Sequence, residues 1–86
     1  MLADEGLVLA KLRDDYGRDW FIGRTYDADG VPHWWRATRR RRLSDRELER
    51  GLAATLIYDT APLLGEALLA QAELEQRLSG WTHAHR

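Results

Sequence analysis

The sequence predicts a single small α+β domain over residues 1–80, in which a three-stranded antiparallel sheet carries two helices packed on one face. Between residues 20 and 38, two runs rich in aromatic and β-branched side chains flank an Asp/Gly turn, which is typical of a β-hairpin. Apolar residues at helical spacing occur before the hairpin and again towards the C-terminus. A length of 86 residues leaves room for one domain with a modest core. The expected element order is α-β-β-(short α)-β-α.

The first helix is expected over residues 4–16. Its apolar side chains fall on one face of the helix: Val8, Leu9, Leu12 and Tyr16. Asp4 and Glu5 suit the positive end of the helix dipole. Gly17 follows directly, and we expect it to end the helix in the left-handed backbone conformation.

The hairpin is expected to turn through residues 27–30, so that Tyr26 pairs with Val31 and Trp20 with Ala37. This register gathers the more apolar set on one face, which we assign to the core: Trp20, Ile22, Arg24, Tyr26, Val31, His33, Trp35 and Ala37. The other face then carries Phe21, Gly23, Thr25, Pro32, Trp34 and Arg36. A slip of one residue would exchange the faces of one strand, and the sequence leaves that alternative open.

A short helix is expected to begin at Ser44, because Ser44 and Glu47 have the spacing of a capping box. Gly51 is expected to end it, and residues 55–58 are then predicted to form the third strand, since Thr, Ile and Tyr favour β structure. The alternative is a helix that continues through Gly51, because three leucines recur every fourth residue: Leu48, Leu52 and Leu56. We favour the strand, since a glycine inside a helix costs about 1 kcal/mol.

The last helix is expected to be capped by Thr60 and to end at Gly80, which leaves residues 81–86 as a flexible tail. Its predicted apolar stripe is formed by Leu63, Ala67, Ala70, Leu74 and Leu78, flanked by Leu64 and Leu68. The predicted core of the domain consists of Val8, Leu9, Leu12, Trp20, Ile22, Trp35, Ala37, Leu48, Leu56, Ala67, Leu74 and Leu78.

The composition argues against several classes of function. The chain has no cysteine, no apolar run long enough for a membrane span and an acidic N-terminus, so a soluble cytoplasmic protein is expected. The net charge of −1 is unusual for a protein that binds nucleic acid through bulk charge. His33 is isolated in a strand, and His83 and His85 have no third ligand nearby, so no metal site is predicted. We expect no enzyme activity, no cofactor and no small-molecule substrate, because no catalytic motif is present.

The predicted working surface combines aromatic and basic side chains: Phe21, Trp34, Arg36, Arg39, Arg40, Arg41 and Arg42. Adjacent residues in a strand point to opposite faces, so Trp35 is expected in the core and Trp34 on the surface. A protein partner, including a second copy of the chain, is the leading prediction because Trp and Arg are enriched at interface hot spots. The alternative is nucleic acid, whose bases stack on aromatic rings. A third possibility is that Trp34 merely covers Gly23 on the neighbouring strand.

Two resemblances bear on these expectations. The segments GRTYDADG, WWRATRRRR and LSDRELERGLAATLIYDT, with the helix that follows, resemble a group of small uncharacterised proteins from high-GC actinobacteria. That resemblance covers most of residues 7–80 and implies no activity. The element order is also similar to that of double-stranded-RNA-binding domains, which bind through a basic start of the final helix and a Gly-Pro-x-His-type loop. Here the segment from Thr60 to Glu66 contains no basic residue and the hairpin turn is acidic, so no RNA-binding function is implied.

Overall fold

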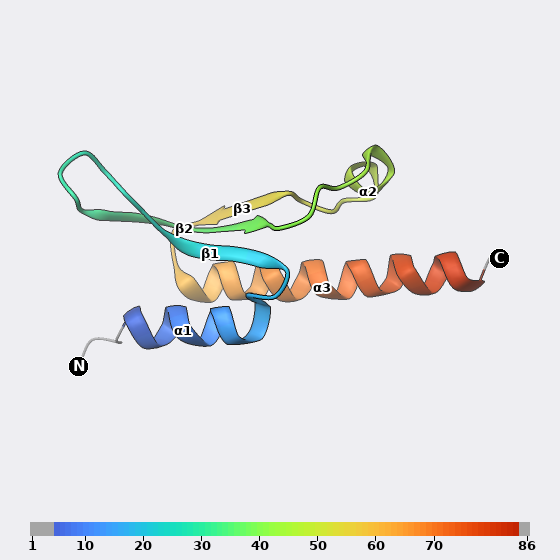
Figure 1. Ribbon diagram of the computed structural model, residues 1–86, viewed down its shortest axis with the longest axis horizontal. Helices are drawn as coiled ribbons and strands as arrows, with labels where there is room; N and C mark the ends of the chain where they lie inside the picture. Colours follow the sequence, from blue (N-terminus) through green and yellow to red (C-terminus); the bar gives the residue numbers. More distant parts are fainter. Residues whose placement is uncertain (1–4, 85–86) are drawn as a thin grey trace.

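Three strands form one antiparallel sheet, and the two long helices lie against the same face of it (Figure 1). The computed structural model describes residues 5–84, with side chains described as far as residue 79. Its elements are α1 (Glu5–Tyr16), β1 (Trp20–Tyr26), β2 (Pro32–Arg39), α2 (Asp45–Glu49), β3 (Thr55–Tyr58) and α3 (Ala61–Ala84). The strand order is β1-β2-β3, so β1 and β3 are the two edge strands. The predicted α+β class and element order are confirmed.

The core lies between the sheet and the two long helices. Its buried members are Leu12, Trp20, Ile22, Trp35, Ala37, Leu56, Leu64 and Leu68. Five further predicted core residues are at least half-buried: Val8, Leu9, Ala67, Leu74 and Leu78. Leu43 and Leu52 are also buried, and they were not predicted. Leu48 was predicted in the core but is 48% exposed, because α2 lies beyond the end of the sheet (Figure 1).

The inward face of α3 differs from the predicted stripe. Leu64 and Leu68 are fully buried, whereas Leu63 is 45% exposed. Further along the helix, the same inward face continues at Gln71 and Glu75, whose side chains meet Arg39. The predicted stripe is therefore confirmed at Ala67, Leu74 and Leu78 and wrong at Leu63 and Ala70, which are exposed. The helix also passes through Gly80 to Ala84, so its expected end was wrong, and residues 85–86 lie outside the described part of the chain.

The hairpin register differs from the predicted one by two residues. Trp20 pairs with Arg39 and Ile22 with Ala37, whereas Tyr26 pairs with Pro32. One residue of the shift comes from a loop of residues 27–31. The second comes from a bulge, where His33 and Trp34 together oppose Thr25. Because a shift of two preserves the alternation of side chains, the predicted core face is retained as far as the bulge, with Trp20, Ile22, Trp35 and Ala37 all buried. Beyond the bulge the assignment was wrong: Tyr26, Val31 and His33 are exposed, because the end of the hairpin extends past the two helices (Figure 1).

The hairpin loop is stabilised by Asp27. The carboxylate Oδ1 of Asp27 accepts hydrogen bonds from the backbone N–H groups of Asp29 and Val31, both at 2.9 Å. The N–H of Asp27 donates to the carbonyl of Val31 at 3.0 Å, which closes the loop one residue later than predicted. Asp residues favour turns because their short side chains can bond the backbone two residues on.

The local signals around α2 and α3 are confirmed. Ser44 caps α2 with both hydrogen bonds of a capping box, made with Glu47. Gly51 follows at a φ of 101°, a conformation that favours glycine. The prediction that residues 55–58 form a strand, and not the continuation of a helix, is confirmed. Thr60 accepts a hydrogen bond from the N–H of Leu63 at the start of α3. Gly17 does not adopt the expected positive φ; a Cβ there would lie 2.3 Å from the carbonyl oxygen of Arg13, so glycine is needed for close approach.

Candidate functional site

One face of the sheet is not covered by any described helix (Figure 1). The cross-strand pairs give this face two rows of side chains, which we call the open sheet face: Phe21, Thr38 and Thr55 in one row, and Gly23, Arg36 and Ile57 in the next. Phe21 is 59% exposed and Ile57 is 54% exposed. None of the six residues is acidic. The face therefore combines exposed apolar area with positive charge.

Arg39 was predicted on the surface, but it is buried, with 7% of its area exposed. The inward alternation of Trp35 and Ala37 continues one pair further than predicted and turns Arg39 towards the helices. Its guanidinium lies 4.3 Å from the ring centre of Trp20 and donates to Ala53 O at 2.9 Å. Its other nitrogens donate to Gln71 at 2.9 Å and Glu75 at 2.7 Å. Arg39 is therefore part of the core, not of a contact surface.

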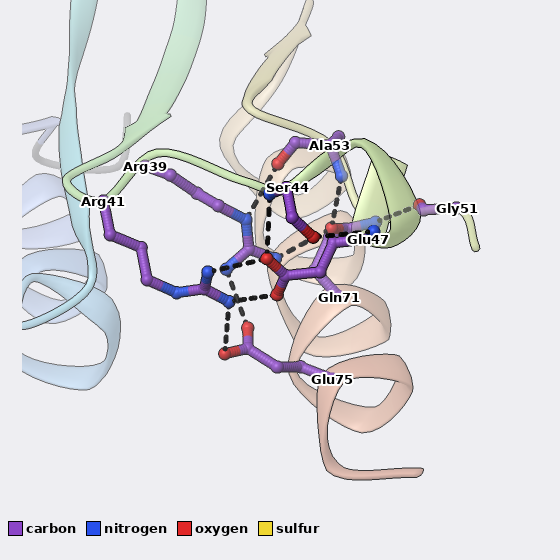
Figure 2. A network of polar contacts seen from close by, with 8 residues as sticks. All are labelled: Arg39, Arg41, Ser44, Glu47, Gly51, Ala53, Gln71 and Glu75. Carbon is purple, nitrogen blue, oxygen red and sulfur yellow. Dashed lines mark hydrogen bonds and ion pairs between the residues drawn. The ribbon is translucent and has the colours of Figure 1, made fainter. Parts of the chain in front are cut away.

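Arg41 is also paired within the chain (Figure 2). It donates to both carboxylate oxygens of Glu47, at 3.0 and 2.7 Å, and to Glu75 at 3.3 Å. The hydrogen bond from Arg41, with the backbone N–H of Ser44, lowers the pKa of Glu47 from its ordinary 4.5 to about 2. The same Glu47 hydrogen bond raises the pKa of Arg41. Arg41 is thus half-exposed, but its charge is matched by two carboxylates.

Gln71 completes this network (Figure 2). Its side-chain oxygen accepts from Arg39 and from the N–H of Ala53 at 2.8 Å, and its amide nitrogen donates to Gly51 O at 3.2 Å. We call Arg39, Arg41, Glu47, Gln71 and Glu75 the paired-arginine cluster. Its side-chain hydrogen bonds join the end of β2, the α2 segment and α3.

Three arginines outside that cluster line a hollow of about 550 Å³ beside Phe21. They are Arg13 from α1, Arg36 from β2 and Arg40, which follows β2. Gly23 and Thr38 of the open sheet face also line it. We call this site the arginine hollow. Of the predicted surface residues, the structure brings Phe21, Arg36 and Arg40 together here. It adds Arg13, which was not predicted.

Trp34 lies apart from the hollow, at the bulge of the hairpin. It is 39% exposed while Trp35 is 5% exposed, so the two adjacent tryptophans differ as predicted. The Trp34 ring stacks on His33 with centroids 4.6 Å apart, and the backbone N–H of Trp34 donates to Thr25 Oγ1. The possibility that Trp34 covers Gly23 is wrong, because Gly23 pairs with Arg36. Arg42 is exposed and does not line the hollow.

A second, mainly apolar groove of about 860 Å³ lies between α1 and the start of α3. Its lining includes Leu7, Val8 and Pro62, and Leu7 is 70% exposed. Lys11 and Glu5 border it, so it carries charges of both signs. It differs from the arginine hollow, where the charged lining residues are all arginines.

Comparison with known proteins gave no match among family models, curated proteins or solved structures. Over the part of the chain that the structure describes, no helix is long and apolar enough to cross a membrane. The same residues contain no group of three His, Cys, Asp or Glu side chains that could hold a metal ion. The side chain of His83 and the whole of His85 lie outside the description. The features that bear on function are the open sheet face and the arginines around it.

Proposed function

We propose that this chain is a non-enzymatic binding module that docks another protein on its open sheet face. The observation that carries the proposal is the exposure of Phe21 and Ile57 on either side of Arg36, on a sheet face without a covering layer. Large apolar side chains that stay exposed together on a small domain are typical of an interaction site. Aromatic and arginine side chains are also the residues that carry most binding energy at protein interfaces.

The distribution of charge supports a protein partner over nucleic acid. Binding a phosphate backbone requires several free cations in a row. Within the four-arginine run, Arg39 and Arg41 are matched by carboxylates of the same chain, which leaves Arg40 and Arg42. One face of the Phe21 ring is occupied by the Arg40 guanidinium, 3.7 Å from the ring centre. Stacking of bases on this ring is limited to its other face.

The same charges support a foreign protein over a second copy of the chain. In a two-fold dimer built on the open sheet face, the same patch meets itself. Arg36 would then face the arginines of its own copy, with no acidic residue on the face to separate them. Like charges brought together at an interface are unfavourable. Self-association is tested by light scattering at several concentrations, and a mass that rises to that of a dimer would favour it.

Site-specific photo-crosslinking in cells tests the docking face. A photoreactive phenylalanine analogue is placed at Ile57 or at Phe21 on the open sheet face. In separate proteins it is placed at Leu69 on the outside of α3 or at Leu7 in the apolar groove. Positions 57 and 69 are matched, because both residues are aliphatic and their exposures are 54% and 52%. We expect a discrete crosslinked protein from position 57 and from position 21, and none from position 69. Crosslinks confined to position 69, or to Leu7 in the apolar groove, would contradict the proposal.

Nucleic acid is the second candidate, because the arginine hollow adjoins an exposed aromatic ring. Fluorescence anisotropy with random-sequence single-stranded DNA and RNA tests it. Binding through phosphates would weaken steeply between about 50 and 200 mM salt. Absence of binding at the lower concentration would remove this candidate and leave the protein partner.

A further inference from the structure

The arginine hollow joins the two sides of the sheet. β1 is an edge strand, and α1 lies on the covered face (Figure 1). Arg13 of α1 nevertheless lines the hollow together with Arg36 and Thr38 of the open sheet face. Its Nε donates to the carbonyl of Ile22 at 3.0 Å, so the side chain reaches past the β1 edge and is held there. Arg13 thereby adds a third cation to Arg36 and Arg40, which lie in β2 and directly after it.

Two of the guanidinium groups that line the hollow, those of Arg13 and Arg40, are held through Nε while their terminal nitrogens have no described acceptor. Arg40 donates through Nε to Gly17 O at 2.8 Å and stacks on Phe21. The Nη2 of Arg13 lies 3.9 Å from the position that a Cβ on Gly23 would occupy. Because both hydrogen bonds use Nε, the paired Nη groups of these arginines stay available. Such pre-positioned forks suit the two oxygens of a carboxylate.

These three arginines are also without a described carboxylate partner. Among the described residues, no Asp or Glu oxygen lies within 4.0 Å of a guanidinium nitrogen of Arg13, Arg36 or Arg40, although Arg24, Arg39 and Arg41 each have one. Three cations around one hollow repel each other, and an anion placed between them relieves that repulsion. Within the part of the chain that the structure describes, the three arginines of the hollow are thus without a counter-charge, whereas Arg39 and Arg41 a few residues away are paired.

We propose that the arginine hollow binds a side-chain carboxylate of the docked protein, and that the partner segment carries acidic and apolar residues two positions apart, which an extended chain presents on one face. This proposal rests on the proposed function, because Phe21 and Ile57 would take the apolar side chains of the same segment. Phe21 borders the hollow and Ile57 pairs with Arg36, so apolar sites lie beside the charge. A phosphate backbone lacks apolar groups at that spacing, whereas an extended peptide presents side chains of both kinds.

Titration of the full chain by NMR tests the inference. The probe is an end-blocked hexapeptide of sequence Leu-Ser-Glu-Ser-Leu-Ser, whose Leu and Glu side chains share one face when it is extended. It is compared with the same peptide carrying Gln for Glu and with a hexanucleotide of random sequence. The readouts are the arginine Nε–Hε signals and the signals of Phe21 and Ile57. We expect the Glu peptide to shift the signals of Arg13, Arg36 and Arg40 and to leave Arg42 unchanged. The Gln peptide should bind about tenfold more weakly, since the charged hydrogen bonds are lost.

Three variants locate the binding. Gly23→Val fills the hollow, and Gly23→Ala does so partly; the space at that Cβ is open apart from Arg13 Nη2, so both should fold. Arg36→Gln removes a charge with no described bond to break. Each of Gly23→Val and Arg36→Gln should weaken the Glu peptide about tenfold, whereas Arg42→Gln, a matched exposed arginine, should change its affinity less than about twofold.

Three other results would contradict the inference. If the Phe21 and Ile57 signals move with both peptides while the arginine signals stay still, the open sheet face binds apolar side chains and the hollow binds no anion. Equal weakening by Arg42→Gln, or stronger shifts with the hexanucleotide, would indicate diffuse attraction or phosphate binding. The docking face itself is judged separately by the crosslinking at positions 57 and 69, so failure of the hollow is distinguishable from failure of the proposed function.

Discussion

The paired-arginine cluster and the arginine hollow use the same side chain in opposite ways. In the cluster, Arg39 is buried and donates to a carbonyl, an amide and a carboxylate, while Arg41 is matched by two carboxylates. In the hollow, Arg13 and Arg40 donate only to backbone carbonyls, and Arg36 has no described acceptor. Arg39 is the last residue of β2 and Arg40 directly follows it, so two residues that are adjacent in the sequence take the two roles.

The comparison teaches that density of positive charge in the sequence is a poor guide to the charge available for binding. The four-arginine run supplies two residues to internal pairing and one to the hollow. The other two cations of the hollow come from elsewhere, Arg36 from the middle of β2 and Arg13 from α1. Charges that are matched inside the chain stabilise it, whereas the unmatched charges of the hollow reduce its stability slightly and are the ones that we propose take part in recognition.

The largest expected effect is in the cluster. Arg39→Ala should lower the free energy of unfolding by about 3 kcal/mol. The substitution removes charged hydrogen bonds and packing on Trp20, and it leaves Glu75 without the buried arginine that balances its charge. For a domain of this size that is a large share of the total stability. Urea unfolding followed by tryptophan fluorescence measures it. Arg40→Ala is the matched control, with an expected loss below about 1 kcal/mol. Equal losses would mean that the two arginines do not differ in structural role.

A smaller loss is expected at Gln71. Gln71→Ala should destabilise the chain by about 1–2 kcal/mol, because the N–H of Ala53 and one donor of Arg39 lose their acceptor. Gln76→Ala lies on the same helix at an exposed position and should change stability by less than about 0.5 kcal/mol. Urea midpoints for the two variants give the comparison. If both variants were equally stable, the polar half of the inward face of α3 would contribute nothing.

The fold was predictable where the determinants are local. The capping box of Ser44 and the cap at Thr60 depend on residues three apart, so the starts of α2 and α3 followed from the sequence. The inward face of α3 did not, because Gln71 and Glu75 occupy positions that a search for apolar residues passes over. The hairpin register failed for a similar reason, since neither the longer loop nor the bulge at Trp34 has a simple compositional signal.

The candidate site was predictable as far as strand alternation reaches. That rule put Phe21 and Arg36 on one face, and the two residues do line one hollow. Extending the alternation from Trp35 by two pairs would also have identified Arg39 as an inward residue. Arg13 could not be found in this way, because its place depends on how α1 packs against the edge of β1.

The pH dependence of the cluster is a third test. Because the pKa of Glu47 is lowered from 4.5 to about 2, its ion pair stabilises the chain fully above pH 4.5 and this contribution is lost as the pH falls towards 2. The carboxyl carbon signal of Glu47 should therefore titrate with a midpoint near 2 by NMR. In Arg41→Gln the main cause of the shift is gone, so the midpoint should rise towards 4.5. An unchanged midpoint in that variant would assign the shift to the Ser44 cap.

The smallest effect is expected at Arg36, and its sign is informative. Arg36→Gln removes no described hydrogen bond, so the free energy of unfolding should change by less than about 0.5 kcal/mol. Because it also relieves repulsion from Arg13 and Arg40 in the hollow, the melting temperature should rise slightly at low ionic strength and return to that of the wild type at about 1 M salt, where charges are screened over about 3 Å. Arg42→Gln, an arginine outside the hollow, serves as the control and should show a weaker dependence on salt. A loss of stability approaching that of Arg39→Ala would mean that Arg36 is held by the fold in the same way as the paired arginines, and the distinction between the two groups would fail.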